Sequence, residues 1–144
     1  MAKTNIGGAD IELDMGNLTI MGHGFGATTA IAMASKDNRI RKVVTFDAWV
    51  TPLKEEIQAK VIMVPQPHCS VNSELFQENV VDNWSLLTSL FKQAKSRRST
   101  SSEASILCLL KDVGHMAFTD LSLLLLLELR LIQFTPSFAQ AFRG

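Results

Sequence analysis

The chain has 144 residues, with 14 Lys and Arg against 14 Asp and Glu, and a hydrophobic content of 47%. A chain of this size and composition builds one folded domain at most, which excludes an intrinsically disordered protein. Because the formal charges cancel, nothing in the composition favours binding to nucleic acid or to an anionic membrane.

The expected elements alternate between strands and helices, while residues 1–17 carry no predicted element. Short apolar runs predict strands at residues 18–21, 42–46, 61–64 (resuming at 69–71 after Pro-Gln-Pro) and 105–110. Helical spacing predicts helices at residues 25–35, 82–95 and 121–134, with a polar, serine-rich loop at 95–105 between the last two. This order predicts an α/β fold, with a parallel sheet, right-handed crossovers and flanking helices.

Targeting and cysteine signals are weak. The first 17 residues lack the apolar core of a signal peptide, and the apolar run at 121–132 is shorter than the roughly 20 residues of a spanning helix. The sequence therefore predicts neither feature in this chain and leaves its localisation open. Cys69 and Cys108 lie in apolar runs, which favours buried free thiols over a disulfide or a metal site.

The segment "LTIMGHGFGATTAI", which starts at Leu18, predicts a strand that turns sharply into a helix. One site built on such a turn binds a dinucleotide pyrophosphate through G-x-G-x-x-G/A, which Gly22, Gly24 and Ala27 fit. Asp47 stands twenty positions after Ala27, where such folds keep a ribose-binding carboxylate. A dinucleotide-binding segment is therefore one hypothesis.

The second site built on this turn is the hydrolase elbow G-x-S-x-G. Gly22 and Gly26 fit its two glycines, and Gly24 stands where the nucleophilic serine belongs. The glycine pattern alone does not decide between a nucleotide site and a hydrolase site, so the residues outside the turn carry the decision.

Four blocks occur in order along the chain: "IMGHGFGATTAI", "VVTFDAWVTPL", "VPQPHCSVNSELFQ" and "GHMAFTD". Together they resemble the platelet-activating factor acetylhydrolases, serine esterases of the α/β-hydrolase class. In that family the elbow is G-H-S-F-G-G, the acid of the triad opens a D-A-W segment, and P-Q-P leads into N-S-E-x-F-Q. The resemblance is dense over residues 18–77, thinner around His115, and weak in residues 1–17 and 121–144.

The resemblance implies a catalytic triad with Asp47 as the acid and His115 as the base, and Phe25 as the residue whose backbone N–H helps hold the oxyanion. A neutral imidazole must take the proton of the nucleophile, and a buried carboxylate fixes its tautomer. The family hydrolyses the short sn-2 ester of platelet-activating factor and of oxidised phospholipids without a cofactor or metal. The implied partners are a phospholipid and a membrane or lipoprotein surface.

The chain departs from the family at the nucleophile, because Gly24 has no side-chain oxygen. Thr28 and Thr29 are expected inside the helix, and His23 is expected to point away from the apex of the elbow, so none of them substitutes. We therefore expect little or no turnover. Catalysis on the order of 10³ to 10⁴ over water can survive the loss of one triad member.

The elbow strand normally lies in the middle of its sheet, yet about 17 residues precede it here. Residues 1–17 are accordingly expected to form a poorly defined segment, and residues 18–144 the C-terminal part of an incomplete α/β-hydrolase domain. The upstream strands and the loop with the second oxyanion donor are expected to be missing. The elbow strand would then expose its edge and both neighbouring faces, which suggests a partner chain that completes the sheet. A noncatalytic lipid- or partner-binding remnant is the remaining hypothesis.

Overall fold

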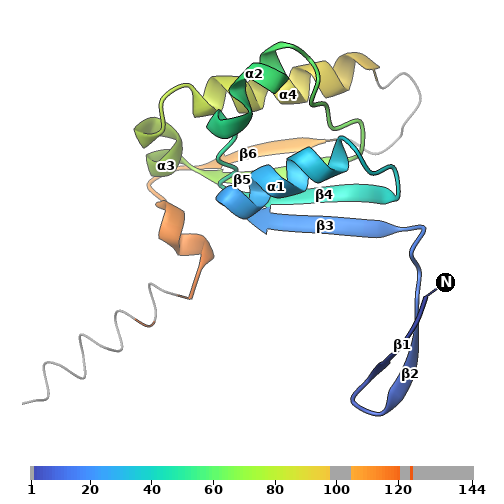
Figure 1. Cartoon of the computed structure of the whole chain (residues 1–144). Coiled ribbons are helices and arrows are strands. Elements are labelled where there is room, and N and C mark those ends of the chain that lie inside the picture. Colours follow the sequence, from blue (N-terminus) through green and yellow to red (C-terminus); the bar gives the residue numbers. More distant parts are fainter. Residues whose placement is uncertain (1, 98–104, 121–123, 125–144) are drawn as a thin grey trace, which may run out of the picture.

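A four-stranded parallel sheet, in the order β3-β4-β5-β6, forms the centre of the computed structural model, which describes residues 2–97, 105–120 and 124 (Figure 1). Its strands are β3 (Leu18–His23), β4 (Ile40–Phe46), β5 (His68–Ser73) and β6 (Ile106–Leu110). The predicted α/β class and parallel sheet are confirmed. Among the described strands, β3 and β6 are the two outer ones, and β4 is the only strand that pairs with β3 in this sheet.

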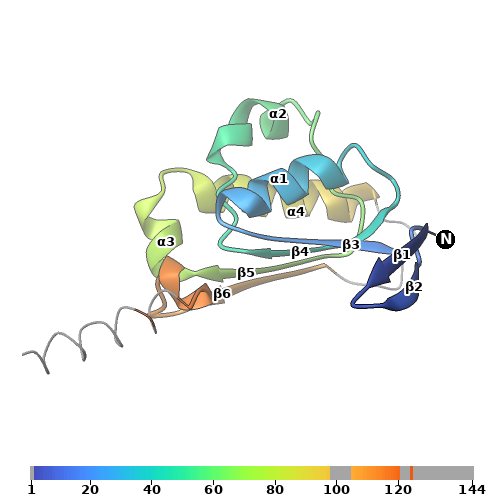
Figure 2. The same ribbon diagram turned by 60° about the horizontal axis from the view of Figure 1, so that its bottom comes forward.

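The described helices of this unit are short except for two. They are α1 (Phe25–Ala34), α2 (Lys54–Gln58), α3 (Glu74–Asn79) and α4 (Asn83–Arg97), with 3-10 turns η1 (Thr51–Leu53) and η2 (His115–Phe118). Figure 2 shows α1, α2 and α4 on the same face of the sheet. None of the helices in the described ranges is long and apolar enough to cross a membrane.

The core lies between this helical layer and the sheet. Its largest fully buried apolar side chains come from α1, β4, α2 and α4, and include Ile31, Val43, Ile57, Leu87 and Leu90. The apolar face of α4 packs as its helical spacing predicts. Within the described residues the opposite face of the sheet is open, and Met21 and Ile106 are 62% and 57% exposed. The expectation that both faces beside the elbow strand are open is wrong for one face, because α1 covers it (Figure 2).

The N-terminal residues form an element that the sequence reasoning missed. Strands β1 (Ala2–Ile6) and β2 (Ala9–Leu13) pair as an antiparallel hairpin. Gly7 and Gly8 both have positive φ, 60° and 86°, which is the backbone of a two-residue type I′ turn. Glycine tolerates this conformation without strain, so the Gly-Gly pair was the available signal.

The third strand begins later than predicted. Residues 61–64 are not a strand, and β5 starts at His68, after the last proline of the Pro-Gln-Pro segment. Ile62 and Val64 are nevertheless 4% and 1% exposed, so their apolar character reflects burial in a connection rather than a ladder. Cys69 and Cys108 are free thiols and half-buried. Part of the predicted loop at 95–105 and the predicted helix at 121–134, apart from Leu124, lie outside the described residues.

Candidate active site

The turn between β3 and α1 is held by the neighbouring strand. Gly24 has φ of 56° and ψ of −119°, a backbone conformation that favours glycine. Its N–H donates to the Phe46 carbonyl at 3.0 Å, and its own carbonyl accepts from the Trp49 N–H at 3.3 Å. The backbone of position 24 is therefore fixed by β4 and by the segment that follows it.

Gly22 serves packing rather than turn geometry. A Cβ atom at this position would lie 2.4 Å from the Gly26 carbonyl oxygen, inside any real contact distance. Gly26 itself has open space where a Cβ would stand. The first glycine of the motif thus lets α1 begin directly against β3, whereas the last one meets no such demand.

Asp47 follows β4 and is completely buried. Its N–H donates to the Val71 carbonyl at 3.0 Å, and its φ of 43° turns the chain away from the strand. The carboxylate accepts hydrogen bonds from the backbone N–H and from the hydroxyl of Ser73, at the end of β5. Two donors therefore fix the acid in one orientation and compensate for its burial.

Asn83, at the start of α4, anchors the segment that follows Asp47. Its side-chain oxygen accepts from the Val50 N–H at 2.8 Å and from the Thr51 N–H at 3.2 Å. Its amide donates to the Ala48 carbonyl at 2.8 Å. Asn83 is fully buried, so these bonds replace lost water contacts and lock the loop beside the elbow.

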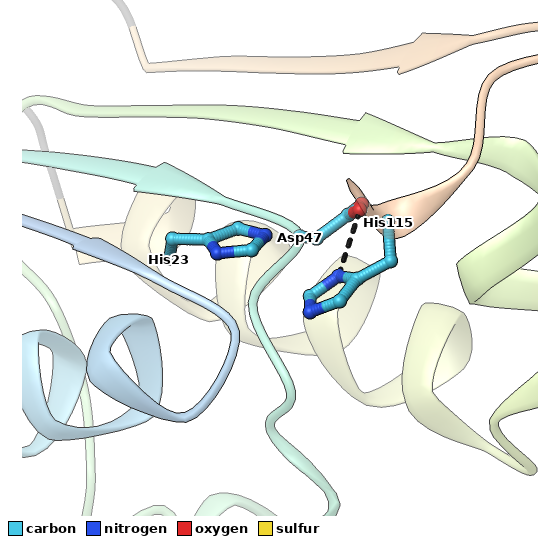
Figure 3. A group of neighbouring side chains, drawn as sticks. All are labelled: His23, Asp47 and His115. Carbon is cyan, nitrogen blue, oxygen red and sulfur yellow. Dashed lines mark hydrogen bonds and ion pairs between the residues drawn. The ribbon is translucent and has the colours of Figure 1, made fainter. Parts of the chain in front are cut away.

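His115 lies in η2, and the structure brings it against Asp47 (Figure 3). Its Nδ1 is 3.1 Å from Asp47 Oδ2. Because a carboxylate only accepts, Nδ1 donates in this bond, and in the neutral imidazole Nε2 is then the nitrogen with the free lone pair. A Cβ placed on Gly24 would lie 3.2 Å from both Nε2 and Cε1 of His115. The predicted acid, base and nucleophile positions therefore converge.

Rings cover both faces of the His115 imidazole. Phe76 stacks on one side, with ring centroids 4.2 Å apart and planes inclined by 19°. His23 stacks at the same centroid distance with an angle of 24°. His23, which was expected to point away from the apex of the elbow, has its ring against the base in the described chain (Figure 3).

The electrostatic state of His23 follows from this position. Burial lowers its pKa below 6.5, and the charge of the neighbouring His115 lowers it further, against the opposing effects of a backbone hydrogen bond to His115 and of Asp47. This shift favours the neutral form of His23. The sequence reasoning missed His23, Phe76 and Ser73, although the last two stand in the "NSELFQ" block that carries the family resemblance.

Side-chain atoms of His23, Asp47 and His115 that could bind a metal all lie within 4.8 Å of one another. An imidazole nitrogen directs its lone pair in the plane of its ring. Since the two rings are stacked and nearly parallel, their lone pairs do not converge on one ion at the roughly 2.0 Å that zinc requires. This arrangement fits an acid–base pair with a stacked neighbour better than a metal centre.

A sharp strand-to-helix turn, a buried acid after the next strand and a histidine facing the apex of the turn define the site class of an α/β-hydrolase. The chain matches the family model for platelet-activating factor acetylhydrolase, isoform II, over residues 8–129. It belongs to this family, as the resemblance implied.

Known relatives match parts of the chain. The platelet-activating factor acetylhydrolase of Cavia porcellus is 31% identical over 95 residues, which cover 66% of this chain and 21% of the relative. The Bos taurus protein of that name is 38% identical over 66 residues, 46% of this chain and 14% of the relative. The Canis lupus familiaris protein is 37% identical over 71 residues, which cover 48% of this chain and 15% of the relative. The matches thus span about a fifth of the relatives or less.

Proposed function

We propose that the chain carries the acid–base half of a phospholipid esterase site and lacks its nucleophile, so that it turns over short-chain esters very slowly or not at all. The observation that carries this proposal is the position of the missing side chain. A Cβ on Gly24 would lie 3.2 Å from His115 Nε2, whose ring is bonded through Nδ1 to buried Asp47. A serine there would meet its base, and glycine supplies no oxygen.

Each remaining group has a proposed role. Asp47 holds the imidazole in the tautomer that leaves Nε2 free and steadies the imidazolium that forms when a proton is taken. Phe25, the first residue of α1, has a backbone N–H without an intrahelical partner, and this N–H is proposed to stabilise an oxyanion. Any residual hydrolysis would run through a water molecule activated by His115.

The proposed substrate class is a glycerophospholipid with a short sn-2 acyl group, as the name of the matched family suggests. Exposed apolar side chains beside the elbow support contact with a lipid surface: Phe25 is 61% and Trp49 40% exposed, and their rings meet edge to face at 6.1 Å. Aromatic residues of this kind are typical of surfaces where apolar and wet environments meet. Residues 18–144 are proposed to be the C-terminal part of a hydrolase domain.

A noncatalytic remnant that binds a partner is the second candidate, and the outer position of β3 in the described sheet favours it. The dinucleotide hypothesis receives no such support. The Asp47 carboxylate is 0% exposed and is bonded to Ser73 and His115, so no accessible oxygen faces a ribose.

The test compares the unmodified chain with Gly24→Ser on phospholipids that carry a short or a long sn-2 acyl group. We expect hydrolysis by the serine variant only, with preference for the short acyl group. Robust hydrolysis by the unmodified chain would contradict the missing-nucleophile proposal. Lipid or partner association that is unaffected by the substitution, without hydrolysis by either protein, would favour the noncatalytic candidate instead.

A further inference from the structure

We infer that His23 is a positioning residue, which together with Phe76 clamps the His115 imidazole so that its Nε2 faces position 24. This inference rests on the proposed function for its catalytic consequence, and on the described contacts for its geometry. It assigns a role to a residue that the triad chemistry does not require.

The clamp has two matching sides from distant parts of the chain. Phe76 comes from α3 and His23 from the end of β3, and both rings stack on His115 at 4.2 Å with angles of 19° and 24°. The bond from Nδ1 to Asp47 fixes one edge of the imidazole, but a single hydrogen bond still tolerates some tilting of the ring about its Cβ–Cγ bond. Stacking on both faces removes this freedom, because rotation would drive the ring into Phe76 or His23.

His23 is itself held against the base. Its ring makes an edge contact with Phe118 at 6.1 Å, and a polar contact with the backbone of His115 opposes the effect of burial on its pKa. Its Nε2 is buried and has no hydrogen-bond partner in the described residues. One nitrogen of His23 therefore contacts the segment that carries the base. The remaining contribution of the ring is the stacking of its face on the His115 imidazole. A phenylalanine at position 23 would keep the aromatic face and lose the polar contact with the His115 backbone.

The charge of His23 matters as well as its shape. When His115 takes a proton, a neutral aromatic face beside it is favourable, whereas a second cation is repulsive. The titratable groups that act on His23 from the surrounding elements are His115 and Asp47. Burial lowers the pKa of His23 from its ordinary value of 6.5, which favours the neutral ring beside His115.

The catalytic test uses the Gly24→Ser background. We expect His23→Ala to lower kcat roughly tenfold with little change in KM, about the effect of one aromatic stacking contact. His23→Phe should restore kcat to within a few fold, and His23→Asn, which can keep a hydrogen bond but has no ring, should not. Met21→Ala, an exposed change on the same strand, is the control and should leave kcat unchanged.

The pH profile separates positioning from a merely structural role. With His23 present, the acid limb of kcat should contain a second ionisation below pH 6.5, and His23→Phe should remove it. Loss of kcat in the alanine and phenylalanine variants alike, or an acid limb that the phenylalanine variant leaves unchanged, would overturn the inference.

An independent readout uses the chain with Gly24. Proton NMR should show ring-current shifts of the His115 ring protons from both flanking rings. It should also show an Nδ1–H signal that the hydrogen bond to Asp47 protects from exchange with solvent. His23→Ala should lose both features and His23→Phe should keep them. If the alanine variant keeps them, the inference is wrong whatever the esterase assay gives. If they respond as expected while Gly24→Ser is inactive, the clamp stands and the proposed function fails.

Discussion

Replacement of Gly24 by serine is the change with the largest expected effect. The backbone there, with φ of 56° and ψ of −119°, disfavours any side chain, at a cost of about 1–3 kcal/mol. At about 3–4 °C per kcal/mol for a domain of this size, Tm should fall by roughly 3–12 °C. His115 must also move by a few tenths of an ångström, since the new Cβ starts 3.2 Å from its ring.

The expected gain in rate follows from the parts that are present. Removal of the serine from a complete triad costs on the order of 10⁶ in kcat. Phe25 supplies one proposed oxyanion donor, and a site that works with one donor alone loses on the order of 10² to 10³ in kcat. A gain on the order of 10³ to 10⁴ over the unmodified chain is therefore expected for Gly24→Ser.

The assay is hydrolysis of p-nitrophenyl acetate, with release of nitrophenolate followed by absorbance and thermal unfolding measured in parallel. Gly24→Ala is the matched control, because it adds the same backbone strain and the same Cβ without an oxygen. It should show the fall in Tm and no gain in rate. A serine variant that unfolds at the same temperature as the alanine variant, yet hydrolyses no faster, would refute the geometric reasoning.

Three other changes test separate parts of the structure. In the Gly24→Ser background, Asp47→Asn should remove most of the gain in kcat and return it toward the rate of the unmodified chain, because the imidazole loses the acceptor that fixes its tautomer; steady-state kinetics with the same ester would measure it, and an unchanged kcat would contradict the assigned acid. Gly22→Ala should destabilise the fold by about 1–3 kcal/mol or more in urea unfolding, because its Cβ would meet a carbonyl at 2.4 Å. Gly26→Ala is the control, because a Cβ at position 26 has no neighbour within 4 Å, and it should be neutral or stabilise the fold by up to about 1 kcal/mol. Equal changes in the free energy of unfolding for the two variants would contradict the packing of Gly22 against Gly26. Arg39→Ala should raise the pKa of Asp37 from about 2 toward 3.8 by NMR titration, since the carboxylate loses its guanidinium partner. Asp37 then no longer contributes the stability that is present above its unfolded pKa and lost as pH falls toward 2, and an unmoved pKa would show that the pair does not form in solution.

The parallel sheet and the elbow could be predicted because local signals and long-range structure agree there. Runs rich in β-branched and aromatic residues, such as residues 42–46, indicate strands, and Gly22 and Gly24 mark a turn that few other residues allow. The prediction that Asp47 and His115 meet came from the family resemblance of the ordered sequence blocks. Their spacing carried no such signal, because 68 residues separate them.

The remaining features depend on contacts that no local pattern records. The apolar character of residues 61–64 is satisfied by burial alone, so periodicity could not separate a connection from a strand. The ring of His23 faces the base because η2 returns to the end of β3, which a reading of the turn by itself could not reveal. Asn83 resembles an ordinary residue at a helix start, yet its amide holds the loop after Asp47.

Covalent labelling tests the central claim most directly. The unmodified chain and Gly24→Ser are each treated with a fluorophosphonate, and the modified residue is located by mass spectrometry of peptides. We predict an adduct on the introduced serine at position 24 and none on residues 23–29 of the unmodified chain. An adduct within residues 23–29 of the unmodified chain would contradict the claim that this site has lost its nucleophile.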